Sequence, residues 1–249
     1  MRRRHRFLRA GAAPSPTLTF RLRGSIHMTA ADSSPPLLAE LALESFGFER
    51  VAIVLTGSAV TQVMPYWIDW ARSAAPETTF RVVMRASAFR FATRHNIEAR
   101  LRARIQVDAW EDELIAAHIE LAEWADLILI YPATLDYASR LANGLADSPS
   151  LLAALTTHAQ VCVAPALPPR SVGNPLIDSI LDRLRAPSNF LVIDPVPGPS
   201  ESSDIALAWV PPPFPDVLRR IEEERVRRTG KRPSGRPSVA VPGTEAASA

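Results

Sequence analysis

Residues 127–147 read L-I-L-I-Y-P-A-T-L-D-Y-A-S-R-L-A-N-G-L-A-D, and this segment is the most informative about architecture. Its first five residues are apolar throughout, as in a strand of a parallel sheet that helices cover on both faces. Residues 135–146 then place apolar side chains at helical spacing, so we expect a helix directly after the strand. A strand followed at once by a helix is the repeating unit of α/β folds.

The same alternation continues outward in both directions. The predicted strands are 51–55, 80–84, 105–107, 127–131, 160–164 and 190–193. The predicted helices are 37–46, 60–73, 87–93, 112–124, 135–146, 150–157, 174–185 and 215–228. Five or six parallel strands with helices on both faces make one α/β domain, a doubly wound, flavodoxin-like (Rossmann-like) sheet over residues 36–228.

The two ends of the chain lack this periodicity. Residues 1–35 are rich in Arg, Pro and Ser, and we expect a disordered basic arm there and a disordered tail at 229–249. Seven arginines and no acid precede Met28, which leaves 21 basic and 26 acidic residues from Thr29 onward, a net charge of −5. An acidic body argues against a nucleic-acid groove. Met28 could itself be the start, so translation of residues 1–27 stays open.

Composition narrows the class of protein. With 47% hydrophobic residues the chain can bury a sizeable core, and no run approaches the roughly 18 apolar residues of a membrane span. The only cysteine, Cys162, can form neither an internal disulfide nor a cysteine-based metal cage. The histidines lack metal-ligand spacing, and the arm lacks the apolar core of a secretory signal. We therefore expect a cytoplasmic protein without a metal.

Unusual residues follow two of the predicted strands, where open α/β sheets bind ligands. Gly57 and Ser58 come after the first strand, and free amides at the start of the next helix could make an anion site there. An equally simple interpretation is that Ser58 caps the helix and Gly57 turns the chain. Ser87 and Phe91 follow the second strand, although Phe91 could serve the core. Neither dinucleotide nor P-loop motifs occur, which favours a mononucleotide.

His118 lies on the predicted helix 112–124, four residues after Leu114 and four before Ala122. A spacing of four puts these side chains on one face, so the imidazole is partly buried. Such a histidine is either a core residue with its hydrogen bonds satisfied or a group that transfers protons near neutral pH.

Together these residues resemble a known family. Residues 118–126 read H-I-E-L-A-E-W-A-D, and 132–147 read P-A-T-L-D-Y-A-S-R-L-A-N-G-L-A-D. The flavin-dependent cysteine decarboxylases (HFCD flavoproteins) have H-I-x-L-x-x-W-A-D, P-A-S-A-N-T and A-N-G-I-A-D in this order. That family groups phosphopantothenoylcysteine decarboxylases with lanthipeptide decarboxylases of the epidermin type. The resemblance extends to G-S after the first strand and S-A-x-x-F after the second, and covers about residues 49–184.

The resemblance implies the fold inferred above and a set of site residues. A flavin, FMN or alternatively FAD, would contact Gly57, Ser58, Ser87, Phe91, Ala133 and Thr134. His118 would be the catalytic histidine, with Asp136 as a second catalytic candidate. It further implies a homo-oligomer, a trimer or dodecamer, with flavin at subunit contacts.

The chain departs from the family in three places. The asparagine of P-A-S-A-N-T falls on Asp136, and an acid near a leaving carboxylate would repel it unless protonated. The substrate-holding P-x-M-N-x-x-M segment falls on residues 165–171, where Pro168 replaces the asparagine. No cysteine follows Cys162, whereas coenzyme A pathway decarboxylases use a late one to reduce the enethiol intermediate.

A Pro- and Ser-rich segment, 195–215, has the composition of a mobile lid over a peptide-sized site.

These features favour oxidative decarboxylation of the C-terminal cysteine of a ribosomally made precursor peptide, leaving an enethiol as in aminovinyl-cysteine biosynthesis. The alternatives are phosphopantothenoylcysteine decarboxylation and a non-catalytic flavin-binding regulatory subunit. A flavin prenyltransferase of similar fold fits less well.

Overall fold

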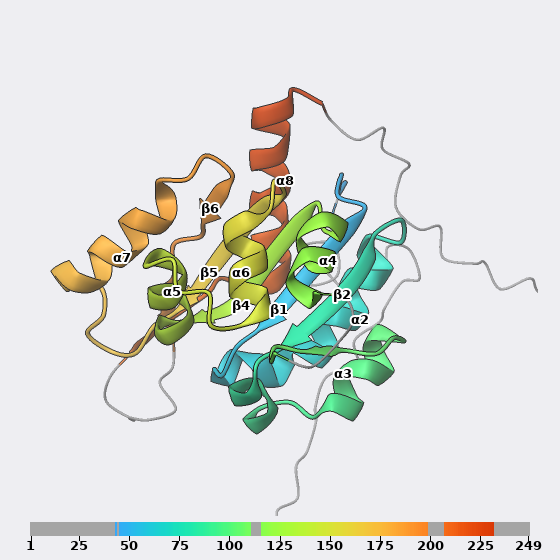
Figure 1. The fold of residues 1–249 in the computed structure, drawn as a ribbon, viewed down its shortest axis with the longest axis horizontal. Coiled ribbons are helices and arrows are strands. Elements are labelled where there is room, and N and C mark those ends of the chain that lie inside the picture. Colours follow the sequence, from blue (N-terminus) through green and yellow to red (C-terminus); the bar gives the residue numbers. More distant parts are fainter. Residues whose placement is uncertain (1–42, 44, 111–115, 199–206, 232–249) are drawn as a thin grey trace, which may run out of the picture.

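A six-stranded parallel sheet forms the centre of the computed structural model, which describes residues 43, 45–110, 116–198 and 207–231 (Figure 1). The strand order is β3-β2-β1-β4-β5-β6, and every pairing is parallel. The strands are β1 Arg50–Leu55, β2 Thr79–Met84, β3 Gln106–Val107, β4 Leu127–Thr134, β5 Gln160–Ala166 and β6 Phe190–Val192. The doubly wound, flavodoxin-like prediction is confirmed.

Helices cover both faces of this sheet (Figure 1). One face carries α2 Met64–Ala74, α3 Arg94–Leu101 and α8 Phe214–Thr229. The other carries α4 Ala117–Trp124, α5 Leu135–Ala142, α6 Pro149–Thr156 and α7 Pro175–Arg185. Because side chains alternate along a strand, Ile53 faces the first layer and Val54 the second, and both are fully buried. This explains why the central strands are apolar at every position.

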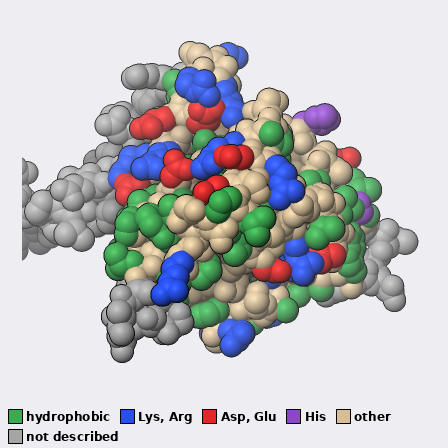
Figure 2. All heavy atoms as spheres, turned by 90° about the vertical axis from the view of Figure 1, so that its left-hand side faces the viewer, with side chains coloured by type: hydrophobic (Ala, Val, Ile, Leu, Met, Phe, Trp, Pro, Cys, Tyr) green, Lys and Arg blue, Asp and Glu red, His purple; other side chains and the backbone are tan. Residues whose placement is uncertain are grey.

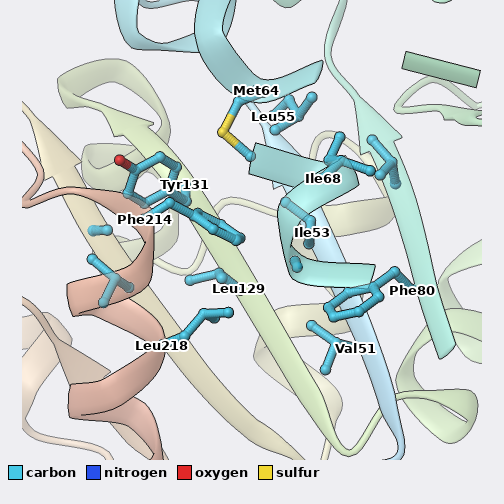
Figure 3. Close-up of a cluster of buried hydrophobic side chains, with 14 of the residues drawn as sticks. Val51, Ile53, Leu55, Met64, Ile68, Phe80, Leu129, Tyr131, Phe214 and Leu218 are labelled. Atoms are coloured by element: carbon cyan, nitrogen blue, oxygen red, sulfur yellow. The ribbon is translucent and has the colours of Figure 1, made fainter. Parts of the chain in front are cut away.

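The core beneath α2 and α8 joins distant parts of the chain (Figure 3). Met64 and Ile68 from α2 meet Phe214 and Leu218 from α8 over the strands. The rings of Tyr131 and Phe214 pack edge to face, with centroids 5.0 Å apart. The buried Tyr131 hydroxyl donates to the Pro212 carbonyl at 3.0 Å, so its polar group is satisfied. These contacts hold α8 against β4.

Two predicted helices differ from the structure: one is not formed at its described residues, and the other ends earlier than expected. Within the predicted helix 37–46, the described residues Leu43, Ser45 and Phe46 are not helical, so this prediction is wrong there. The next residue, Gly47, is not helical either. Its N–H donates to the Glu222 carboxylate of α8 at 3.0 Å. This bond joins the segment to α8, and no local sequence pattern predicts it. The predicted helix 135–146 ends earlier, at Ala142, because Gly144 adopts a left-handed φ of 68°.

Other boundaries also shift. The predicted helix 60–73 divides into a 3-10 turn, η1 Ala59–Val63, and the α-helix α2, while 87–93 is a 3-10 turn, η2 Ala86–Arg90. Helix α3 was not expected, and the side chain of Thr93 caps it by accepting from the Asn96 N–H at 3.2 Å. The first part of the predicted helix 112–124 lies outside the described residues, and its remainder is α4.

The ends of the predicted lid pair with one another. Strands β7 Val196–Gly198 and β8 Ala208–Val210 are antiparallel, and residues 199–206 between them lie outside the described part. Trp209 exchanges two backbone hydrogen bonds with Leu167, at 2.7 and 3.0 Å. The described ends of this segment are therefore anchored strands beside the loop after β5.

Charged groups of both signs lie close together on the face shown in Figure 2, with hydrophobic side chains between them. Ion pairs occur among the exposed side chains: Arg185 pairs with both Asp182 and Asp194, at 2.9 and 2.7 Å. Such exposed pairs contribute little stability individually, at most about 1 kcal/mol. Among the described helices, none combines the length and apolar character needed to cross a bilayer.

Candidate functional site

Thr56 joins the loop after β1 to the carboxyl end of β4. Its hydroxyl donates to the Pro132 carbonyl at 2.6 Å and accepts from the Thr134 N–H at 3.0 Å. The Thr56 carbonyl in turn accepts from the Thr61 hydroxyl at 2.6 Å. Sequence reasoning passed over Thr56, although a polar residue directly after a buried strand was a usable signal. This fully buried threonine fixes the loop after β1 against the end of β4 at the carboxyl edge of the sheet.

Gly57 allows the loops after β1 and β2 to approach closely. A Cβ at position 57 would lie 2.5 Å from the Ser87 Cβ and 3.1 Å from the Ser87 carbonyl oxygen. Real Cβ atoms essentially never come within 3.0 Å of another heavy atom, so no larger residue fits without movement. The structure thus brings two of the predicted flavin residues, Gly57 and Ser87, into contact.

The hydroxyl groups beside this contact are available to a ligand. Ser58 precedes η1 without making a capping hydrogen bond, and the exposed Ser87 makes no side-chain hydrogen bond within the described chain. Hydroxyls and turn amides are suitable donors for a phosphate. The α-helix predicted to begin just after Ser58 needs correction, because the five-residue η1 intervenes and α2 begins only at Met64. The donor set nevertheless fits the phosphate of a flavin nucleotide.

The remaining predicted flavin residues occupy the same edge. Ala133 is buried at the end of β4, while Thr134 is half-buried and caps α5 by accepting from the Tyr137 N–H at 3.4 Å. Phe91 directly follows η2 and is half-buried. Of the two aromatic residues here, Phe89 is the one that packs against the core. Phe91 therefore stays a candidate for ligand contact.

A buried polar network supports the loops after β2 and β3. The Asp108 carboxylate accepts from the Ser150 N–H and hydroxyl, both at 2.8 Å, and pairs with Arg85 at 3.2 Å. Arg85 also donates to the Ser148 hydroxyl at 3.0 Å. The Tyr137 hydroxyl meets that of Ser150 at 2.9 Å, and burial raises the pKa of Tyr137 far above its usual range. This network was not predicted from the sequence.

His118 lies in the first turn of α4, with its Nδ1 buried and unpartnered among the described residues. Its ring packs against Trp110, with centroids 5.5 Å apart and an angle of 72°. Both line a cavity of about 880 Å³, to which Arg81, Arg94 and Arg104 also contribute. None of the six predicted flavin residues lines this cavity, so the chain presents two separate centres.

Asp136 is exposed in the first turn of α5 and has a cationic partner. Arg140, one turn later, donates to its carboxylate at 3.0 Å and also pairs with Asp147. The hydrogen bond that Arg140 donates to the Asp136 carboxylate raises the pKa of Arg140. The negative charge of Asp136, a reason to doubt its role, is therefore offset within the same helix.

Cys162 is fully buried in β5, and burial raises the pKa of its thiol far above the ordinary value. Such a thiol is chemically inert in the native protein. Among the described residues, no group of three or more His, Cys, Asp or Glu side chains could hold a metal ion.

Comparison with known proteins gives consistent matches. The Flavoprotein family model matches residues 43–223. The cypemycin cysteine dehydrogenase (decarboxylating) of a Streptomyces species is 30% identical over 128 residues, 51% of this chain and 67% of that protein. The coenzyme A biosynthesis bifunctional protein CoaBC of Bacillus subtilis is 36% identical over 89 residues, 35% of this chain but only 22% of the relative.

Solved structures agree with these matches. The cypemycin decarboxylase CypD is 26% identical with a TM-score of 0.60, covering 76% of this chain and 99% of its own. Other similar structures are described as FMN-dependent cysteine decarboxylases. Because the family model spans well over half of the sequence and the fold agrees, this chain belongs to the Flavoprotein family.

Proposed function

We propose that the protein is an FMN-dependent decarboxylase that acts on the C-terminal cysteine of a peptide. The contact between Gly57 and Ser87 carries this proposal, because it brings uncommitted hydroxyls from two loops together at the ligand-binding edge of the sheet. The similarity to the cypemycin enzyme supports the choice of substrate class.

In the proposed mechanism, bound FMN would supply the oxidising power, as a two-electron acceptor for the hydride equivalent lost from the cysteine β-carbon. Ser58 and Ser87 would hold its phosphate, and His118 would accept the thiol proton. The resulting thioaldehyde places a thiocarbonyl β to the carboxylate, where it acts as an electron sink. Carbon dioxide then leaves, and the enethiol remains. Arg140 offsets Asp136, so the departing carboxylate need not meet an uncompensated acid.

The enethiol is proposed as the final product. Reducing it would need a thiol near the substrate, and the chain's single cysteine, Cys162, is sealed inside β5. Phosphopantothenoylcysteine remains the second candidate substrate because the CoaBC relatives match. The arginines around the His118 cavity would suit its phosphate, although Arg94 and Arg104 both already pair with Glu98.

We also propose a homo-oligomer, a trimer or dodecamer. The separation of the His118 cavity from the flavin residues supports this, since a second copy could bring the two centres together. Light scattering coupled to size-exclusion chromatography tests it, and a monomer under turnover conditions would contradict it.

The function is tested by incubating the purified, FMN-loaded protein with synthetic peptides ending in cysteine and following their mass. A loss of about 46 mass units, carbon dioxide plus two hydrogens, is expected with wild type but not with His118→Asn. Matched peptides ending in serine should stay unchanged. Phosphopantothenoylcysteine is the parallel substrate, and its turnover alone would replace the peptide proposal. Bound FMN with no turnover of either substrate would favour a non-catalytic subunit.

A further inference from the structure

Among the described residues, none forms a hydrogen bond with the Nδ1 of His118 that would fix the orientation of its ring. This atom is buried and has no partner among the described residues. Catalytic and metal-binding histidines usually have their second nitrogen held by a carboxylate or a carbonyl, which sets the ring plane. Some other contact must therefore hold the ring of His118, and its packing against Trp110 is the aromatic contact that the structure gives it.

Trp110 is itself held at its far end. Its indole Nε1–H donates to the Asp147 carbonyl at 3.0 Å, although the side chain is 52% exposed. The bond fixes the ring of a residue that solvent would otherwise leave free to rotate. Asp147 follows α5 and pairs through its side chain with Arg140, which also holds Asp136. The indole thus connects the His118 helix, α4, to the segment that follows α5.

The backbone beneath Trp110 is rigid as well. Asp108, two residues earlier, is bound by Ser150 and Arg85, and its N–H donates to the Met84 carbonyl at 2.9 Å. The Ala109 N–H donates to the Val107 carbonyl at 2.9 Å. Trp110 is therefore anchored through its main chain to β2 and α6, and through its side chain to the segment after α5.

We propose that Trp110 is the positioning residue for His118: its anchored indole holds the imidazole in one orientation in the cavity. This inference rests on the proposed function for its catalytic consequence, but the orientation itself can be measured without turnover. Edge-to-face packing of an aromatic pair is favourable beyond burial alone, enough to favour one ring orientation by several fold. A reacting group displaced by about 1 Å can lose about a hundredfold in rate.

The first test is spectroscopic and uses the full-length protein labelled with 13C-histidine. His118→Asn identifies the His118 ring signals among the five histidines. In wild type we expect one set of signals shifted by the indole ring current. Trp110→Ala should lower the 13C order parameter of the His118 ring, while Trp110→Phe should retain the wild-type value. A wild-type order parameter in Trp110→Ala would overturn the proposal, whether or not the protein turns over a substrate.

The second test separates positioning from folding. For Trp110→Ala we expect kcat with a cysteine-ended peptide to fall about ten- to hundredfold with KM nearly unchanged, and Trp110→Phe to recover most of it. Tyr66→Ala is the matched control, because it removes a similarly exposed aromatic ring, 58% exposed, from α2. A folded Trp110→Ala protein with wild-type kcat would overturn the proposal. Inactive wild type with the expected spectra would instead refute the proposed function alone.

Discussion

Replacing Gly57 with alanine tests the packing on which the candidate flavin site depends. The added Cβ would lie 2.5 Å from the Ser87 Cβ, whereas ordinary contacts begin at 3.4 Å, so the two loops must separate by about 1 Å. Overpacking of this kind costs about 1–3 kcal/mol. For a domain of this size, each kcal/mol lowers the melting temperature by about 2–4 °C, so we expect a decrease of about 2–12 °C.

We expect Gly57→Ala to weaken FMN binding by more than its loss of folding stability alone would, because the displaced Ser87 hydroxyl could no longer reach the phosphate. Losing one hydrogen bond to a charged group costs about 1.5–3 kcal/mol, or about ten- to hundredfold in Kd. Differential scanning fluorimetry and quenching of FMN fluorescence measure the two effects separately. Adding Ser87→Gly removes the main clash, so it should restore the melting temperature but not the affinity. Wild-type melting and FMN affinity in Gly57→Ala would refute the reasoning.

Two further predictions concern buried groups. Asp108→Ala leaves Arg85 without its ion-pair partner and Ser150 without its acceptor, so we expect a loss of about 3–5 kcal/mol in the free energy of unfolding, measured in urea. Asp108→Asn keeps an acceptor and should lose less; equal stability of all three proteins would contradict a structural role for the network. Iodoacetamide at pH 8 should label Cys162 only after denaturation, because burial raises the pKa of its thiol. Rapid labelling of the native protein, followed by mass spectrometry, would show that β5 opens.

Much of the architecture was predictable because it depends on local patterns. The apolar segments 51–55 and 127–131 identify strands covered on both faces, and both lie within observed strands, β1 and β4. Boundaries were less predictable: β4 extends to Thr134 because its pairing with β5 resumes after a register shift between Ile130 and Ala133, with Thr134 opposite Ala166. The predicted helix 37–46 is not formed at its described residues. The adjacent Gly47 instead donates its backbone N–H to Glu222, 175 positions away.

The candidate site, like the fold, was only partly predictable from the sequence. Topology places the ends of parallel strands at one edge, so Gly57 and Ser87 could be expected near each other from the sequence alone. The residues of the candidate site also carried the family resemblance that the family model confirms. The sequence by itself therefore determined the fold class and the family, and it predicts which edge of the sheet binds the ligand.

Contacts between distant residues required the folded chain. The bond from Thr56 to Pro132 spans 76 positions and that from Trp110 to Asp147 spans 37, and neither follows a helical or strand period. Their formation depends on how helices pack on the sheet, which sets the distance and angle between side chains from different elements. For this reason, the packing of Trp110 on His118 and the hydrogen bond from Trp110 to Asp147 became visible only in the tertiary structure.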